Sequence, residues 1–165
     1  MVIATGTATG LHRESLGSVQ FVFAVAPHHP LAHAHEPLSD EVIRQHRAVA
    51  VADSIQHGRG VSIGLLAGQD VFTVSGMPTK LDAQIRGLGA GFLPTCLAQP
   101  YIDSGRLIVK RVERPEHQIQ VGYAWRKGAQ TDKGRALQWW LARMQSPVTR
   151  MALLGSAADS NRDRR

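Results

Sequence analysis

The segment from Val71 to Leu107 constrains the fold of this 165-residue chain most, because strand-like and helix-like stretches alternate along it. Val71–Val74 is rich in residues that favour extended structure. The residues that follow predict a helix over 79–86, with Ser75 as its capping residue and Gly87 at its end. Such alternation is typical of an open parallel sheet, whose ligands bind at the carboxyl ends of its strands. A small-molecule pocket is therefore the first function to expect.

The sequence predicts two further buried strands. Residues 89–94 are rich in glycine, and Gly89 and Gly91 would let neighbouring backbone or a ligand come close. Residues 19–26 form a continuous apolar run, the pattern of a strand covered on both faces. The other expected elements are strands over 1–4, 48–52, 106–112 and 119–125, helices over 41–46 and 135–144, a crossover over 5–17 and a frayed tail from Ser146 onward.

Composition excludes several classes of protein. The longest apolar run, Val19 to Pro27, is far too short to cross a membrane, and no secretory signal is visible. Cys96 is the one cysteine, so no internal disulfide can form, which suits a reducing cytoplasm. The net charge is +6, but the basic residues are scattered among carboxylates and form no stripe with interleaved aromatics. We therefore expect a cytoplasmic protein whose present segment does not itself bind DNA.

Several short motifs occur in a fixed order along residues 1–145. They are MVIATG at 1–6, FVFAVAPHHPLA at 21–32, FTVS at 72–75, RGLGAGFLP at 86–94, GRL at 105–107 and YAWRK at 123–127. Together with a terminal helix over 134–144, this series resembles the effector-binding domain of LysR-type transcriptional regulators. No single motif is diagnostic, and the resemblance rests on their order and spacing.

The resemblance implies an α/β fold of the periplasmic-binding-protein-like type 2, a bilobal effector domain. Its second lobe would be nearly complete over 19–120, and its first lobe would be partial. Residues 1–18 would be the remnant of that first lobe and a crossover, 121–145 its return strand and C-terminal helix, and 146–165 a flexible tail. Regulators of this family also carry a winged helix-turn-helix and a linker helix, which we expect to be absent from this truncated chain.

The resemblance also implies an effector site between the lobes. Thr5 matches the hinge position, and Thr73 and Ser75 match the strand-to-helix turn of the second lobe. There a hydroxyl and free helix N–H groups would seat a carboxylate, while Gly89 and Gly91 would let backbone approach the effector. Each residue could instead have a purely structural role. Thr5 could be a linker residue, Thr73 an ordinary strand residue and Ser75 a helix cap.

Other chemistries receive less support from the sequence. Four histidines, His28, His29, His33 and His35, share one proline-broken loop, but a solvated loop is favoured over a metal site. Cys96 has no base or orienting group that spacing can assign to it, so we expect a buried structural thiol. Neither a metal, a cofactor nor an enzymatic activity is therefore expected.

The sequence thus predicts an effector-sensing domain that binds a small, anionic organic molecule and thereby controls transcription. Its expected partners are this effector and further copies of the chain in a homo-oligomer, with DNA bound only through the missing N-terminal domain and no membrane. A free-standing periplasmic-type solute-binding protein and a non-functional truncated remnant stay open as alternatives. Because first-lobe elements would be missing, the strand over 119–125 would have an open edge, and the helix with Trp139 and Trp140 would have an open apolar face. The chain is therefore expected to self-associate.

Overall fold

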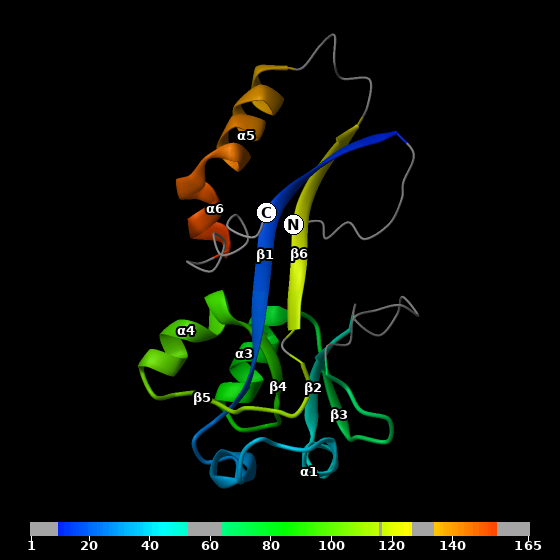
Figure 1. The fold of residues 1–165 in the computed structure, drawn as a ribbon, viewed down its shortest axis with the longest axis vertical. Coiled ribbons are helices and arrows are strands. Elements are labelled where there is room, and N and C mark those ends of the chain that lie inside the picture. Colours follow the sequence, from blue (N-terminus) through cyan, green and yellow to red (C-terminus); the bar gives the residue numbers. More distant parts are fainter. Residues whose placement is uncertain (1–9, 53–63, 116, 127–133, 155–165) are drawn as a thin grey trace. The chain divides into compact units, whose positions relative to one another are not determined.

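The computed structural model describes residues 10–52, 64–115, 117–126 and 134–154. The chain divides into two compact units (Figure 1). Unit 2 is the continuous segment Phe21–His117, whereas unit 1 combines Met1–Gln20 with Gln118–Arg165. The long strand β1 (Leu11–Val25) contributes residues to both units.

Unit 2 is built on a mixed sheet. The second half of β1 pairs antiparallel with β4 (Gly91–Pro94) on one side and with β5 (Ile108–Val109) on the other. Strands β2 (Ala48–Val51) and β3 (Val71–Val74) pair in parallel. A parallel bridge from Ala48 to Ala90 joins β2 to the start of β4, which gives the order β3-β2-β4-β1-β5. The expected alternation of strands and helices is present, but the sheet is mixed and not purely parallel.

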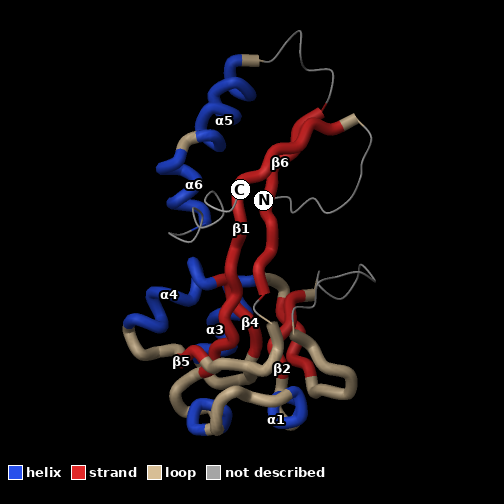
Figure 2. The backbone as a smooth tube through the Cα atoms, in the orientation of Figure 1, coloured by secondary structure: helices blue, strands red, loops and turns tan. Residues whose placement is uncertain are grey.

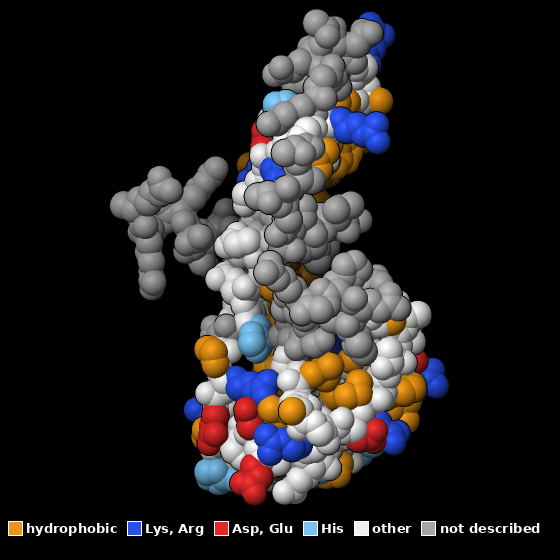
Figure 3. Space-filling view, turned by 90° about the vertical axis from the view of Figure 1, so that its right-hand side faces the viewer, with side chains coloured by type: hydrophobic (Ala, Val, Ile, Leu, Met, Phe, Trp, Pro, Cys, Tyr) orange, Lys and Arg blue, Asp and Glu red, His pale blue; other side chains and the backbone are white. Residues whose placement is uncertain are grey.

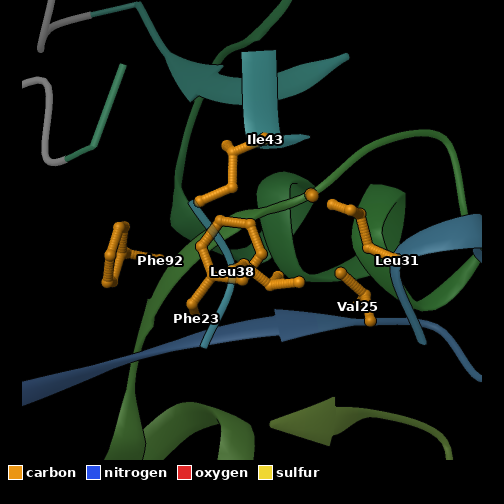
Figure 4. Packing of buried hydrophobic residues seen from close by; sticks show 7 residues of the cluster. Phe23, Val25, Leu31, Leu38, Ile43 and Phe92 are labelled. Atoms are coloured by element: carbon orange, nitrogen blue, oxygen red, sulfur yellow. The ribbon is translucent and has the colours of Figure 1, made fainter. Parts of the chain in front are cut away.

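Helices pack on both faces of this sheet, and Figure 2 draws them in blue beside the red strands. The helices α3 (Met77–Ile85) and α4 (Thr95–Asp103) pack on one face, around Ala24 and Leu93. The short helices η1 (Pro30–His33) and α1 (Asp40–Arg44) lie on the other. There Phe23, Val25 and Phe92 from the sheet meet three residues from the covering segment, Leu31, Leu38 and Ile43 (Figure 4). Successive residues of β1 thus enter opposite cores, as the two-residue period of a strand requires.

Unit 1 contains a two-stranded ribbon and two helices. The first half of β1 pairs with β6 (His117–Arg126), and the contacts of Ser18 with Gln118 and of Glu14 with Tyr123 make the pair antiparallel. The helices α5 (Arg135–Gln145) and α6 (Pro147–Leu154) follow. Their apolar residues join a small core around the ribbon, made of Leu16, Val121, Tyr123 and Leu154, with Trp140 set edge-on to Tyr123.

Three expectations from the sequence require correction. The segment 5–17 was expected to be a crossover, but β1 already begins at Leu11, because the polar residues of 11–18 occupy the open side of a ribbon. The tail expected from Ser146 onward instead begins with α6, whose Leu154 is buried. The strand expected over 106–112 is reduced to the two residues of β5. The strand expected over 1–4 lies outside the described residues.

Candidate functional site

The turn between β3 and α3 presents exposed hydroxyl groups beside an open helix end. Thr73, on β3, and Ser75, in the bend that follows, are both exposed. Ser75 does not cap the helix, contrary to expectation: the capping residue is Gly76, and no side chain accepts a hydrogen bond there. Pro78 has no N–H, and the first intrahelical bond runs from Lys80 N to Gly76 O at 3.0 Å. The first-turn N–H groups of Met77 and Thr79 therefore have no intrahelical acceptor and carry the positive end of the helix dipole.

Two polar side chains lie on the buried face of the same helix, one turn apart. Lys80 is 7% exposed and Gln84 is fully buried. Within the part of the chain that the structure describes, neither the amide nitrogen nor the amide oxygen of Gln84 has a hydrogen-bond partner, and no carboxylate pairs with Lys80. Burial alone lowers the pKa of the Lys80 amine from its ordinary 10.5 to about 8.

The two glycines of the candidate site have different surroundings. Gly89 is buried against β2, where an added Cβ would lie 2.7 Å from the carbonyl oxygen of Arg47 and 2.9 Å from Val49 Cγ2. Strand packing is thus a sufficient reason for a glycine at this position. At Gly91 the nearest atoms to such a Cβ are polar: Gln84 Nε2 at 3.1 Å, the Val49 carbonyl oxygen at 3.4 Å and Lys80 Nζ at 3.5 Å. Contact of either glycine with an effector stays a prediction, and Thr5 lies outside the described residues.

A comparison with known families decides what kind of domain this is. The family model of the LysR substrate binding domain matches residues 2–146. The chain belongs to this family. The resemblance inferred from the motifs is therefore confirmed, and so is the α/β fold of the periplasmic-binding-protein-like type, which the solved regulatory domains of LysR proteins share.

Relatives of this LysR domain are transcriptional regulators. An uncharacterized HTH-type transcriptional regulator, YeeY of Escherichia coli K12, is 46% identical over 125 residues, which cover 76% of this chain and 40% of YeeY. The chain thus spans less than half the length of that relative. The regulatory domain of MetR from N. meningitidis has the same fold, with a TM-score of 0.65, 16% identity and coverage of 95% of this chain and 69% of that one. The effector-binding domain of QuiR, solved in complex with shikimate, matches with a TM-score of 0.55, 15% identity and coverage of 76% and 60%.

The histidine loop of this LysR domain contributes contacts to its packing. His29 is buried and its Nδ1 accepts a hydrogen bond from the N–H of Leu31 at 3.2 Å, while His28 Nε2 lies 3.2 Å from the carbonyl oxygen of Arg86. Burial, followed by the proximity of His46 and then of His28, lowers the pKa of His29. Within the described residues, no three His, Cys, Asp or Glu side chains lie close enough together to hold a metal ion. Cys96, in the first turn of α4, is half-buried and not buried as expected.

Charged side chains on unit 2 largely pair with one another. Glu36 binds Lys110 at 2.9 Å and Arg111 at 3.0 Å, and these hydrogen bonds, that of Lys110 first, lower the pKa of Glu36 to about 2. Arg114 pairs with Asp40 across the same region. On the face drawn in Figure 3, Lys and Arg side chains are mixed with Asp and Glu. Among the described helices none has the length and apolar character needed to span a bilayer.

The sequence pattern drew attention to the hydroxyls of Thr73 and Ser75, whose contact with an effector stays a prediction, but not to the buried side chains of Lys80 and Gln84. Lysine and glutamine are usually exposed, so their burial could not be expected from residue type alone. A signal was nevertheless present, because the two residues lie four apart and flank Ala83, which is buried against β2 and β3. That spacing places all three on one face of the helix.

Proposed function

We propose that this LysR substrate-binding domain senses a small organic anion through the open end of α3. The carboxylate of the effector would accept hydrogen bonds from the free N–H groups of Met77 and Thr79. The hydroxyls of Thr73 and Ser75 would donate two more. In this arrangement the helix dipole stabilises the negative charge of the carboxylate, and the neutral hydroxyls fix the orientation of the carboxylate group.

The observation that carries this proposal is the uncapped first turn of α3. Most helices satisfy their first N–H groups with a capping side chain, and here Ser75 stands beside the helix end without doing so. Both its hydroxyl and that of Thr73 are exposed to solvent. A related effector-binding domain, that of QuiR, was solved in complex with shikimate, which is itself a carboxylate. The site thus has the donors that such a ligand needs.

Membership of the LysR family supports a role for this domain within a whole transcriptional regulator. Binding of the effector would change the equilibrium between states of an oligomeric regulator and thereby control transcription. Contact with DNA would be made through a helix-turn-helix domain and not through the present segment, in which opposite charges are mixed. Such a regulator would work in the cytoplasm, where its DNA is. No role as an enzyme is proposed.

The experiment is a ligand screen on the wild-type protein and on a double variant, Thr73→Val with Ser75→Ala. Shikimate and a set of small mono- and dicarboxylates would be tested by thermal shift, and each hit would be measured by titration calorimetry. A ligand at a hundredfold excess over its Kd adds about 2.7 kcal/mol to the unfolding free energy, which is easily detected.

The double variant removes two hydrogen bonds to a charged group, so its affinity for a true effector should fall at least about tenfold. A matched control is Ser15→Ala, which removes an equally exposed hydroxyl from β1 in unit 1 and should leave the affinity unchanged. If every carboxylate hit binds the double variant as tightly as the wild type, then Thr73 and Ser75 do not bind the effector and the proposed site is wrong.

A further inference from the structure

His29 is a buried histidine at the corner that links β1 to η1. Its side chain is 5% exposed, and its Nδ1 accepts a hydrogen bond of 3.2 Å from the N–H of Leu31, which makes His29 the capping residue of η1. Leu31, in turn, is 1% exposed and packs in the core beside Phe23 and Val25 (Figure 4). The imidazole ring of His29 thus holds the turn that carries a core residue of unit 2.

This hydrogen bond requires one protonation state of the ring. A ring nitrogen can accept a hydrogen bond only while it carries no proton, so the ring of His29 is neutral and its proton is on Nε2. A second proton would occupy Nδ1 and turn the acceptor into a donor that faces the N–H of Leu31. That buried N–H would then lose its acceptor, which destabilises the folded corner.

The nearest titratable groups also oppose a charge on His29. The ring of His46, from the segment after α1, has its centroid 5.4 Å from that of His29. A positive charge on His29 would therefore be buried and repelled by the charged forms of His46 and His28, which is why its pKa is lowered. His28 itself responds differently, because its Nε2 faces the carbonyl oxygen of Arg86 and can donate to it in either protonation state.

No carboxylate compensates for such a charge within the described residues. The ion pairs recorded there do not include His29. Of the acidic residues on the segments around this core, four are already paired with basic side chains and two are exposed. The paired ones are Glu36, Asp40, Asp70 and Asp82, the exposed ones are Glu41 and Glu113, and the further basic groups are Arg44, Arg47, Arg86, Lys110, Arg111, Arg114, His33 and His35.

We propose that His29 makes the corner between β1 and η1 a pH-sensitive switch, in which uptake of a proton by its ring releases η1 from the core of unit 2. Because the pKa of His29 is lower in the folded corner than in the open one, the open form binds more protons. The closed corner is therefore fully stabilised above about pH 6.5, the ordinary pKa of histidine, and loses this stability as the pH falls below it. The switch does not involve the turn between β3 and α3, so it is independent of the proposed effector site.

The test is amide hydrogen exchange of Leu31, followed by NMR on the wild type, on His29→Asn and on His33→Asn. Asparagine at a capping position accepts a hydrogen bond from a helix N–H but does not titrate, so His29→Asn keeps the cap and removes the switch. His33→Asn is the matched control, because it replaces an exposed histidine of the same short helix. From about pH 7 to about pH 5.5, the opening equilibrium at Leu31 should rise at least about threefold more in the wild type and His33→Asn than in His29→Asn.

Equal pH dependence in the wild type and His29→Asn overturns the inference, and so does a pH dependence that His33→Asn abolishes. Because His29→Asn can fail to fold, a second measurement uses the wild type alone. NMR of the side-chain nitrogens of His29 should show a neutral ring with no proton on Nδ1 at about pH 7.5. The ring should then take up its second proton below about pH 6.5, as Leu31 loses its protection from exchange. A proton on Nδ1 at the higher pH, or protonation that leaves Leu31 protected, contradicts the switch.

Discussion

The substitution Gly89→Ala separates a packing role from a ligand role at the junction of α3 and β4. The new methyl group would lie 2.7 Å from the carbonyl oxygen of Arg47 and 2.9 Å from Val49 Cγ2. Backbone cannot yield as a flexible side chain does, so β2 and the segment before β4 must separate. The bond from Ala90 N to Arg47 O, 2.9 Å long, and its neighbour from Val49 N to Ala90 O lie at this contact.

The magnitude follows from three terms. Overpacking in a well-packed interior costs about 1–3 kcal/mol, and one weakened backbone hydrogen bond costs about 1 kcal/mol. Alanine also lowers the conformational entropy of the unfolded chain, which stabilises the folded state by about 0.4–1 kcal/mol. Gly89→Ala should therefore lower the unfolding free energy of unit 2 by about 1–3.5 kcal/mol.

The assay is urea unfolding followed by circular dichroism, with Gly76→Ala as the control in the same unit. A Cβ at Gly76 meets only Pro78 Cδ, at 3.8 Å, and the backbone there is extended, so the control should cost less than about 1 kcal/mol. If Gly89→Ala matches the wild type within about 0.5 kcal/mol, the packing argument is refuted and the need for glycine must come from a ligand.

Three further predictions concern stability and association. The pKa of Lys80 is about 8 in the folded state and 10.5 ordinarily, so the unfolded chain binds the extra proton between these values and stability rises with pH across them. Lys80→Met should be more stable than the wild type at neutral pH, by up to about 3 kcal/mol, and thermal unfolding should show this gap closing between pH 8 and 10.5. Leu93→Ala, at a fully buried position of β4, should cost about 2–5 kcal/mol in urea unfolding, and a loss below about 1 kcal/mol contradicts the core described for α3 and α4. Trp139 is 61% exposed on α5, so Trp139→Gln should reduce self-association in light scattering at high concentration, and an unchanged mass speaks against this face as the contact.

The elements that could be predicted from the sequence are those with a clear apolar pattern and a clear end. The segment from β3 through α4 is of this kind, since Gly87 has the positive φ of +72° that a helix-ending glycine adopts. The first half of β1 could not be predicted as easily. Its residues are covered on one side by a small core and are otherwise half-exposed, so charged side chains interrupt the apolar run.

In the candidate site, the location of the hydroxyls could be predicted from the sequence, but the burial of Lys80 could not. The positions of Thr73 and Ser75 follow from their place after a strand, which the sequence marks. The burial of Lys80 depends on the packing of α3 against the sheet, where its Nζ lies beside Gly91 of β4, and this is a tertiary contact that no local pattern encodes. For α6 a signal was available, because Pro147 occupies the first turn, where proline is favoured, ahead of the apolar residues Val148 and Met151.

The division of the chain has a consequence for the order of folding. Unit 2 is continuous in sequence, so its contacts can form without the rest of the chain, whereas unit 1 pairs segments about 100 residues apart. Closing a flexible loop of that length costs roughly 4 kcal/mol in chain entropy, before any contact between β1 and β6 can offset it. Once unit 2 has folded, it holds the beginning of the β6 segment near β1, since His117 packs on Phe92 of the adjoining strand β4. The ribbon of unit 1 then closes as a hairpin does, with the whole of unit 2 serving as its turn.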